Sequence, residues 1–264
     1  MENRVNYPVV NLCGGRGMRL NERTEDVPKP MVEIGGIPIL QHIMQIYASA
    51  GFKRFILCLG YKGDKIRDYF MHLTEWRGRD FTLKLGHQND VEYHQNGVED
   101  WTITFTDTGV DAETALRLKR VEKYIDAPRF LMTYGDGVTD LSINTLIASH
   151  ERHKRYATVT SVRPRTHFGM LKIDSEGTVK AYDEKPVLST YVNGGFFCLD
   201  REVFQYIGKE NEAFERGPMQ RLIKDEQLAT HIHDGFWGCM DTFKDYLTLN
   251  DMWARNEAPW RMKT

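Results

Sequence analysis

Three short apolar runs in this chain each end at glycine, and this pattern restricts the fold more than any other feature of the sequence. Residues 9–13 lead into Gly14-Gly15, residues 55–59 lead into Gly60, and residues 130–134 lead into Gly135-Asp136-Gly137. A short apolar run bounded by a glycine turn is typical of a buried strand. Between the first two runs, apolar residues three and four positions apart predict an amphipathic helix near residues 38–47. Strand, helix and strand in this order predict parallel strands joined by a right-handed crossover.

The remaining pattern extends this α/β order and then changes. Further helices are predicted at 66–70, 115–124 and 143–150, and further strands at 101–105 and 157–162. Beyond about residue 165, strand-like pieces at 170–173, 179–182 and 195–199 lie between turns, and residues 242–257 have helical spacing. We therefore expect one doubly wound α/β domain: a mostly parallel, Rossmann-like sheet with inserted antiparallel β-structure and a C-terminal helical segment.

Composition narrows the class of protein. The chain has 264 residues, 41% of them hydrophobic, and a net charge of -2. This balance gives no indication of a nucleic acid or an anionic membrane as partner. No apolar run has the length of a membrane span or of a signal-peptide core, so we expect a cytoplasmic protein. The cysteines are scattered without a CxxC pair, which predicts reduced, mostly buried thiols: Cys13, Cys58, Cys198 and Cys239.

Two segments have the chemistry of a phosphate site. In the loop that begins at Gly14, glycines let backbone N–H groups approach a phosphate chain, and Arg16 and Arg19 add positive charge. Lys29 stands between two prolines, which stiffen the backbone around its ammonium group. Taken singly, the first segment could be a tight turn with solvated arginines, and Lys29 an ordinary loop lysine.

Two aspartates are candidates for binding a hard cation. Asp136 lies on a glycine turn at a predicted strand end, and Asp241 precedes the last predicted helix. The alternatives are a turn aspartate and a helix N-cap aspartate, respectively. His150 and His153 have metal-like spacing, but their charged neighbours favour a solvated helix face. His231 and His233 alternate as on an exposed strand.

The order of these pieces is more specific than any one of them. It resembles the sugar nucleotidyltransferase family (nucleotide-sugar pyrophosphorylases) through nearly the whole chain. The motifs that carry the resemblance are Leu12-Cys13-Gly14-Gly15-x-Gly17-x-Arg19-Leu20, Lys29-Pro30-Met31, Gly60-Tyr61, Gly135-Asp136, Glu184-Lys185-Pro186, Asn193-Gly194-Gly195 and Met240-Asp241-Thr242. The sequence departs from the family's usual residues in three places: Cys13 for alanine, Met18 for threonine, and Ala115-Leu116 for a glycine pair.

The resemblance implies an enzyme that joins a nucleoside triphosphate, expected to be CTP, to a sugar 1-phosphate, expected to be glucose 1-phosphate, with Mg²⁺ held by Asp136 and Asp241. The implied catalytic residues are Arg19, Lys29, Asp136, Lys185 and Asp241. The implied nucleotide-binding residues are Leu12, Gly14, Gly15, Arg16, Gly17, Met18, Arg19, Lys29, Thr108, Gly109, Arg117, Gly135 and Asp136. The implied sugar-phosphate-binding residues are Gly169, Glu184, Lys185, Asn193 and Gly194.

The resemblance also implies how the domain is divided. Within residues 1–264 we expect a nucleotide-binding core over about 1–165, a sugar-binding part over about 166–241 and the helical segment over about 242–264. It implies a homo-oligomer as well. Two alternatives remain open: the same reaction with another base or sugar, and a non-catalytic subunit that binds a nucleotide sugar and regulates a partner.

Overall fold

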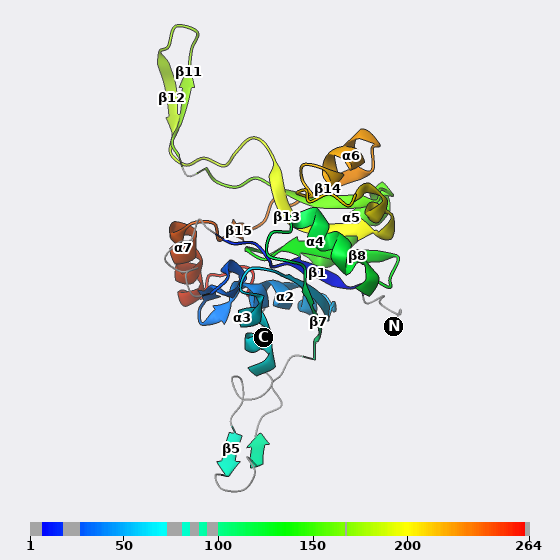
Figure 1. The fold of residues 1–264 in the computed structure, drawn as a ribbon. Coiled ribbons are helices and arrows are strands. Elements are labelled where there is room, and N and C mark those ends of the chain that lie inside the picture. Colours follow the sequence, from blue (N-terminus) through cyan, green and yellow to red (C-terminus); the bar gives the residue numbers. More distant parts are fainter. Residues whose placement is uncertain are drawn as a thin grey trace.

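A single seven-stranded sheet forms the centre of the computed structural model, which describes residues 7–17, 27–72, 81–84, 90–93, 100–166 and 168–261 (Figure 1). Its strands are β1 (Val9–Leu12), β4 (Arg54–Leu59), β7 (Thr102–Asp107), β8 (Arg129–Tyr134), β10 (Ala157–Val162), β13 (Val192–Asp200) and β14 (Leu228–Ile232). They lie in the order β14-β10-β13-β8-β1-β4-β7. β13 runs antiparallel to both of its neighbours, whereas the other pairs in this sheet are parallel.

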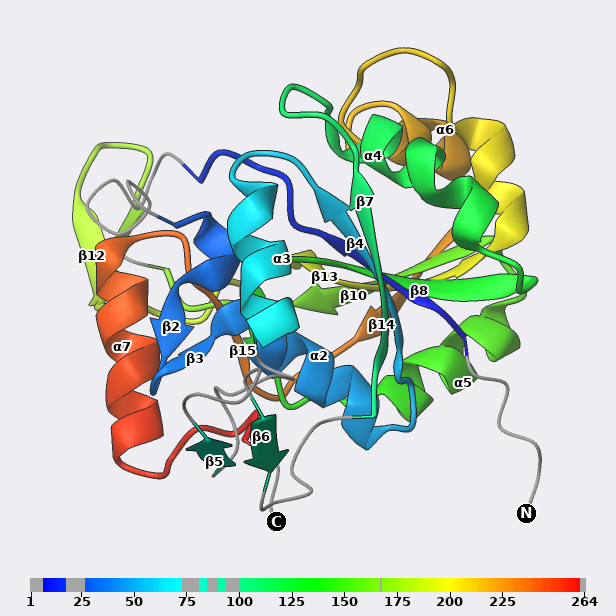
Figure 2. The same cartoon turned by 60° about the horizontal axis from the view of Figure 1, so that its bottom comes forward.

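Helices cover both faces of this sheet, as Figures 1 and 2 show. One face packs against α2 (Ile39–Ser49), α3 (Gly63–His72) and α5 (Ile143–His153), and the core on this side extends to α7 (Phe243–Ala254) beside the sheet. The other packs against α4 (Thr114–Val121), the 3-10 helix η5 (Arg201–Tyr206) and α6 (Pro218–Lys224). A hydrophobic core lies on each face of the sheet, and each strand contributes to both, because successive side chains point to opposite faces. Phe55 and Leu57 belong to the first core, and Ile56 and Cys58 belong to the second.

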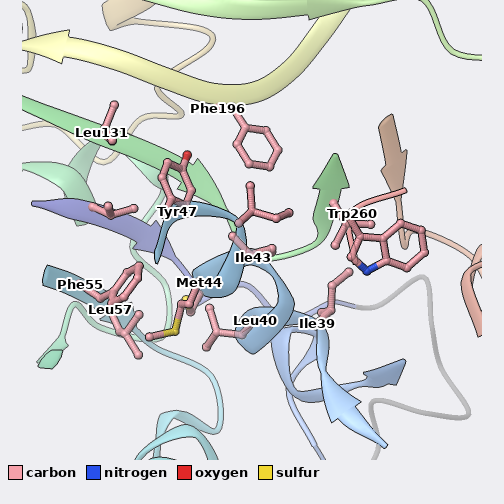
Figure 3. Close-up of a cluster of buried hydrophobic side chains, with 14 of the residues drawn as sticks. Ile39, Leu40, Ile43, Met44, Tyr47, Phe55, Leu57, Leu131, Phe196 and Trp260 are labelled. Atoms are coloured by element: carbon pink, nitrogen blue, oxygen red, sulfur yellow. The ribbon is translucent and has the colours of Figure 1, made fainter. Parts of the chain in front are cut away.

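Helix α2 anchors the larger core (Figure 3). Its apolar residues at spacings of three and four are fully buried: Ile39, Leu40, Ile43, Met44 and Tyr47. Truncating one such side chain to alanine typically destabilises a protein by about 2–5 kcal/mol. This core holds β1 and β8 side by side, in the register Leu12 to Tyr134. The site described below starts from these two strand ends.

Four two-stranded sheets surround the central one. They are β2 (Glu33–Ile34) with β3 (Ile37–Pro38), β5 (Phe81–Lys84) with β6 (Asp90–Tyr93), β9 (Gly137–Thr139) with β15 (Trp237–Cys239), and β11 (Met170–Ile173) with β12 (Val179–Asp183). The β11-β12 hairpin extends away from the body of the molecule as an arm (Figure 1). Its exposed apolar residues include Leu171, Ile173, Val179 and Tyr182.

The expected fold class is confirmed, with differences in detail. The predicted helix at 115–124 ends earlier, as α4 followed by the 3-10 helix η4 (Glu122–Tyr124).

The expectation of a solvated His150 is wrong: the residue is 1% exposed, and its ring lies 2.8 Å from Thr158 Oγ1 and faces Asp200. His233 is half-buried rather than exposed, and its Nε2 lies 2.9 Å from Asp140 Oδ1.

The cysteines are free thiols, as expected. Cys13, Cys58 and Cys198 are buried and Cys239 is half-buried. Burial raises the pKa of Cys58 to about 12 and also raises that of Cys198. Among the described residues, no helix is long and apolar enough to cross a membrane.

Candidate active site

A cavity of about 750 Å³ opens where β1 and β8 end. In a doubly wound sheet, ligands bind beyond the carboxyl ends of the parallel strands, and this cavity lies there. It joins segments from the whole chain. Its walls include Leu12, Gly15, Gly17, Lys29, Arg117, Tyr134, Gly135, Asp136, Asn193, Gly194, Glu215, Trp237, Cys239 and Asp241.

Lys29 and the two predicted metal aspartates meet in this cavity. Lys29 Nζ lies 2.6 Å from Asp136 Oδ2 and 2.6 Å from Asp241 Oδ1. The lysine side chain is 12% exposed, and the two carboxylates are 27% and 41% exposed. The three residues were predicted from positions 107 and 212 residues apart in the sequence, and the structure brings them into direct contact.

Contacts between short backbone segments bring Lys29 and the two aspartates together. Pro30 packs against Gly135, where an added Cβ would lie 2.9 Å from Pro30 Cγ, so the turn that carries Lys29 sits on the turn that carries Asp136. The pairing of β9 with β15 and the hydrogen bond from Met240 N to Asp136 O, 2.9 Å long, bring Asp241 alongside. Asp241 is not the helix N-cap: Thr242 caps α7 and forms a capping box with Asp245. The Asp241 carboxylate is therefore turned to the cavity.

The electrostatics of this cluster suit a cation. Burial alone would lower the pKa of Lys29, but the charge of Asp136 and hydrogen bonds to both aspartates outweigh it, so the pKa is raised. Ligand atoms of Asp136, Cys239 and Asp241 all lie within 4.8 Å of one another. Carboxylate oxygens are the ligands that hard divalent cations prefer. The donor set therefore fits a divalent cation, and the ammonium group of Lys29 lies between the same two carboxylates.

The glycine loop presents two kinds of glycine. Gly15 and Gly17 line the cavity, and nothing lies within 4 Å of a Cβ added at Gly15. Gly14 instead packs on Arg117, because an added Cβ would lie 1.9 Å from Arg117 Nη1. Arg16 pairs at the surface with Asp111, 2.7 Å away. The predicted residues Met18 and Arg19 lie outside the described residues.

Arg117 holds the segment expected to read the base. The residue is 4% exposed. Its guanidinium group donates to the carbonyl oxygens of Gly14, Leu59, Gly109 and Val110 and to Thr108 Oγ1, over 2.8–3.3 Å. Burial lowers its pKa, although the group remains a guanidinium. The Thr108 hydroxyl donates inward to Leu59 O, 2.6 Å away. The structure therefore places Arg117 beneath the segment and joins three loops through it.

The residues expected to bind the sugar phosphate are divided between two places. Asn193 and Gly194 line the cavity. Glu184 and Lys185 follow the arm strand β12, pair with each other at 3.0 Å, and are 56% and 48% exposed. Gly169 packs against Tyr182 of the arm. A second cavity of about 970 Å³ lies between the root of the arm and α7, and it shares Trp237, Cys239 and Asp241 with the first.

Comparison with known proteins decides the family. The family model described as nucleotidyl transferase matches residues 8–256. The chain belongs to the nucleotidyl transferase family. A probable glucose-1-phosphate cytidylyltransferase of Bacillus subtilis (strain 168) is 43% identical over 255 residues, which cover 96% of this chain and 98% of that protein. The glucose-1-phosphate cytidylyltransferase of Salmonella typhi is 43% identical over 258 residues, with the same coverage.

A solved structure has a similar fold. The crystal structure of HddC from Yersinia pseudotuberculosis complexed with GMP-PN has a TM-score of 0.68 at 24% identity, and the match covers 94% of this chain and 99% of that one. At this identity the likeness shows the fold alone. The family confirms the expected class of enzyme, a nucleotidyl transferase.

Several residues of the cavity had no role assigned from the sequence, among them Thr114, Glu215 and Trp237. Trp237 Nε1 donates to Gly194 O, 2.7 Å away, and Tyr134, the last residue of β8, donates its hydroxyl to Glu215. Glu215 lies in a loop of mixed polarity before α6, so no periodicity singled it out. The one indication in the sequence was its apolar neighbour Phe214, which is fully buried.

Proposed function

We propose that this chain transfers the cytidylyl group of CTP to glucose 1-phosphate, forming a nucleotide sugar and pyrophosphate. The observation that carries the proposal is the meeting of Lys29, Asp136 and Asp241 at the strand ends of a nucleotidyl transferase fold. The choice of base and sugar rests on the relatives that are 43% identical over nearly their whole length. We place the nucleotide in the part before about residue 165 and the sugar in the part from about 166 to 241.

The proposed reaction is an in-line displacement. An oxygen of the sugar 1-phosphate attacks the α-phosphorus, the bond from that phosphorus to the bridging oxygen breaks, and pyrophosphate leaves on the opposite side. The attacking oxygen is already anionic, so the reaction needs no general base. Catalysis then comes from positioning and from charge stabilisation in the transition state.

We assign these tasks to residues of the cavity, of the glycine loop and of the root of the arm. The backbone N–H groups near Gly15 and Gly17, with Arg19, bind the triphosphate. Lys29 places its ammonium group against phosphate oxygens that gain charge during the reaction. Asn193 and Gly194 bind the sugar, and Glu184 and Lys185 reach its hydroxyls and phosphate from the root of the arm.

We propose Mg²⁺ as the metal cofactor. The donors at the site are the carboxylates of Asp136 and Asp241, which are the oxygen ligands that this ion prefers. When bound, the ion supplies charge neutralisation between two anionic substrates. The thiol of Cys239 is not a third ligand in this proposal, because Mg²⁺ is a hard cation that prefers oxygen donors to sulfur.

We also propose a cytoplasmic homo-oligomer. The arm supports self-association: its paired residues Leu171 and Tyr182 form part of an exposed apolar face, and an isolated two-stranded hairpin is marginal in water. Light scattering of the purified protein measures the mass of the assembly, and a monomer at micromolar concentration would contradict this part of the proposal.

The test of the proposed function is a pyrophosphate-release screen with Mg²⁺, in which each of four nucleoside triphosphates is paired with several sugar 1-phosphates. We expect the highest kcat/KM with CTP and glucose 1-phosphate. A better pair of another kind would keep the reaction and correct the substrates. No release with any pair, by protein that still binds a nucleotide sugar, would contradict the proposal and favour a regulatory subunit.

A further inference from the structure

A chain of hydrogen bonds crosses the wall of the cavity from α4 to β13. Thr114 Oγ1 donates to Glu215 Oε2 over 3.2 Å, and the Tyr134 hydroxyl donates to Glu215 Oε1. Asn193 Nδ2 then donates to the Tyr134 oxygen over 3.1 Å. All four residues line the cavity. The chain therefore connects the helix beside the base segment with the strand that carries the sugar-binding residues.

The direction of every hydrogen bond in this chain is fixed by Glu215. An ionised carboxylate can only accept, so Tyr134 must donate to it. Burial and the charge of Glu215 raise the pKa of Tyr134, so the phenol keeps the proton that it donates. The phenol oxygen is then left to accept, and it accepts from the amide nitrogen of Asn193.

The hydrogen bond to the oxygen of the Asn193 amide is consistent with an amide nitrogen that donates to Tyr134. Asn193 Oδ1 accepts from Gly195 N over 2.8 Å, so the amide is held at both its oxygen and its nitrogen. A carboxamide nitrogen carries two N–H groups, and Tyr134 uses one of them. Asn193 is exposed to the cavity. The second N–H is therefore available as a donor to a ligand in the cavity, and rotation of the amide would break both bonds.

We propose that Glu215 is a positioning residue for the sugar. Acting through Tyr134, it fixes Asn193 as a hydrogen-bond donor to a hydroxyl oxygen of the sugar 1-phosphate. This inference rests on the proposed function and adds to it a residue that selects among sugars. A sugar that lacks the matching hydroxyl leaves the amide donor unpaired in the complex, and such a loss is a strong basis for discrimination.

The alternative is that the chain only braces the fold. A brace would affect stability and both substrates together, whereas a positioned donor affects one substrate and one hydroxyl. Tyr134→Phe separates the two, because it removes a single oxygen atom from the chain and keeps the aromatic ring that packs against Phe197. Glu215→Ala removes the fixed acceptor itself.

The experiment measures KM for each substrate and kcat, in wild type and variants, with glucose 1-phosphate and its monodeoxy analogues. We expect Tyr134→Phe to raise KM for glucose 1-phosphate by about tenfold, the effect of one lost hydrogen bond, with KM for CTP within about twofold. With one of the deoxy analogues, wild type and Tyr134→Phe should have the same KM. The double variant Glu215→Ala/Tyr134→Phe should match Glu215→Ala alone, because both changes act on one chain.

Glu212→Ala is the matched control. It removes a carboxylate from the same loop, but that carboxylate pairs with Arg221 outside the chain, and we expect wild-type KM values. The melting temperature of each variant shows whether it folds. Equal rises of KM for both substrates, or the same factor with every deoxy analogue, would overturn the inference. If wild type turned over no sugar phosphate, the proposed function would fail first, before any variant is compared.

Discussion

Lys29 is the residue on which the chemistry of the cavity depends most. Its ammonium group lies 2.6 Å from each of two carboxylates that come from distant segments. Because those carboxylates raise its pKa above 10.5, Lys29 stays charged at neutral pH and can oppose the charge that develops on a phosphate. The cluster thus keeps a cation in place before any substrate arrives.

Lys29→Ala and Asp136→Ala should each lower turnover by at least about 10²–10³, the usual effect of losing one preorganised contact. The fold should persist, since both side chains lie in an open cavity, and circular dichroism can check this. Near-wild-type turnover in either variant would refute the assignment. Lys53→Ala, which removes a surface lysine paired with Asp100, is the control and should be active.

The same lysine has a definite pH dependence. A raised lysine pKa means that the ion pairs stabilise the folded state fully below the unfolded pKa and are lost as pH rises through the folded value. The melting temperature of wild type should therefore exceed that of Lys29→Ala by a constant amount between pH 7 and about pH 9. The difference should shrink above pH 10.5. A difference that shrinks near neutral pH would show that the ammonium group is not held as described.

At the scale of elements, the loop after β1 is shaped by the helix α4. Arg117 of α4 fills the space beneath Gly14 and Gly60, where added Cβ atoms would lie 1.9 Å and 2.5 Å from its Nη1. Gly15 faces open space. The two neighbouring glycines therefore differ: Gly14 is needed for packing, whereas Gly15 borders open space, where we propose that the triphosphate binds.

Gly14→Ala should destabilise the protein by about 1–3 kcal/mol, the range for forcing extra atoms into a packed site. Gly15→Ala is the matched neighbour: we expect an unchanged melting temperature but a higher KM for the triphosphate. Thermal unfolding and steady-state kinetics of both variants measure these effects. Equal melting temperatures for the two variants would contradict the packing of Arg117 against Gly14.

Most elements of the core were predictable because their local pattern and their environment agree. Residues 157–162 form a core strand at the predicted bounds, and α2 begins at the predicted apolar positions. The strands β9 and β15 escaped prediction because three residues carry too little periodicity. Their pairing is a long-range event, and it is this pairing that brings Asp241 to Asp136.

Only those residues of the candidate site that belong to sequence motifs could be predicted. Lys29, Asp136 and Asp241 could be named from the resemblance, and their contact follows from the fold. The separation of Glu184 and Lys185 from the cavity could not be predicted, because the sequence of a hairpin does not say in which direction it leaves the body. The inward hydroxyl of Thr108 likewise depends on Leu59, a partner 49 residues away.

At the scale of the whole molecule, the site exists only when the chain is folded end to end. Lys29 follows β1, Asp136 follows β8, and Asp241 comes just before the last helix, so the sheet and its two helical layers must all form to bring them together. The account requires that the two carboxylates share one divalent cation in the complex with substrate.

The most direct test is a crystal structure with CTP and Mn²⁺, in which the anomalous difference map locates the ion. We predict one strong peak in contact with carboxylate oxygens of both Asp136 and Asp241, at about 2–2.6 Å, and beside a phosphate of the nucleotide. A peak that contacts neither aspartate, or a nucleotide bound away from Lys29, would contradict the account.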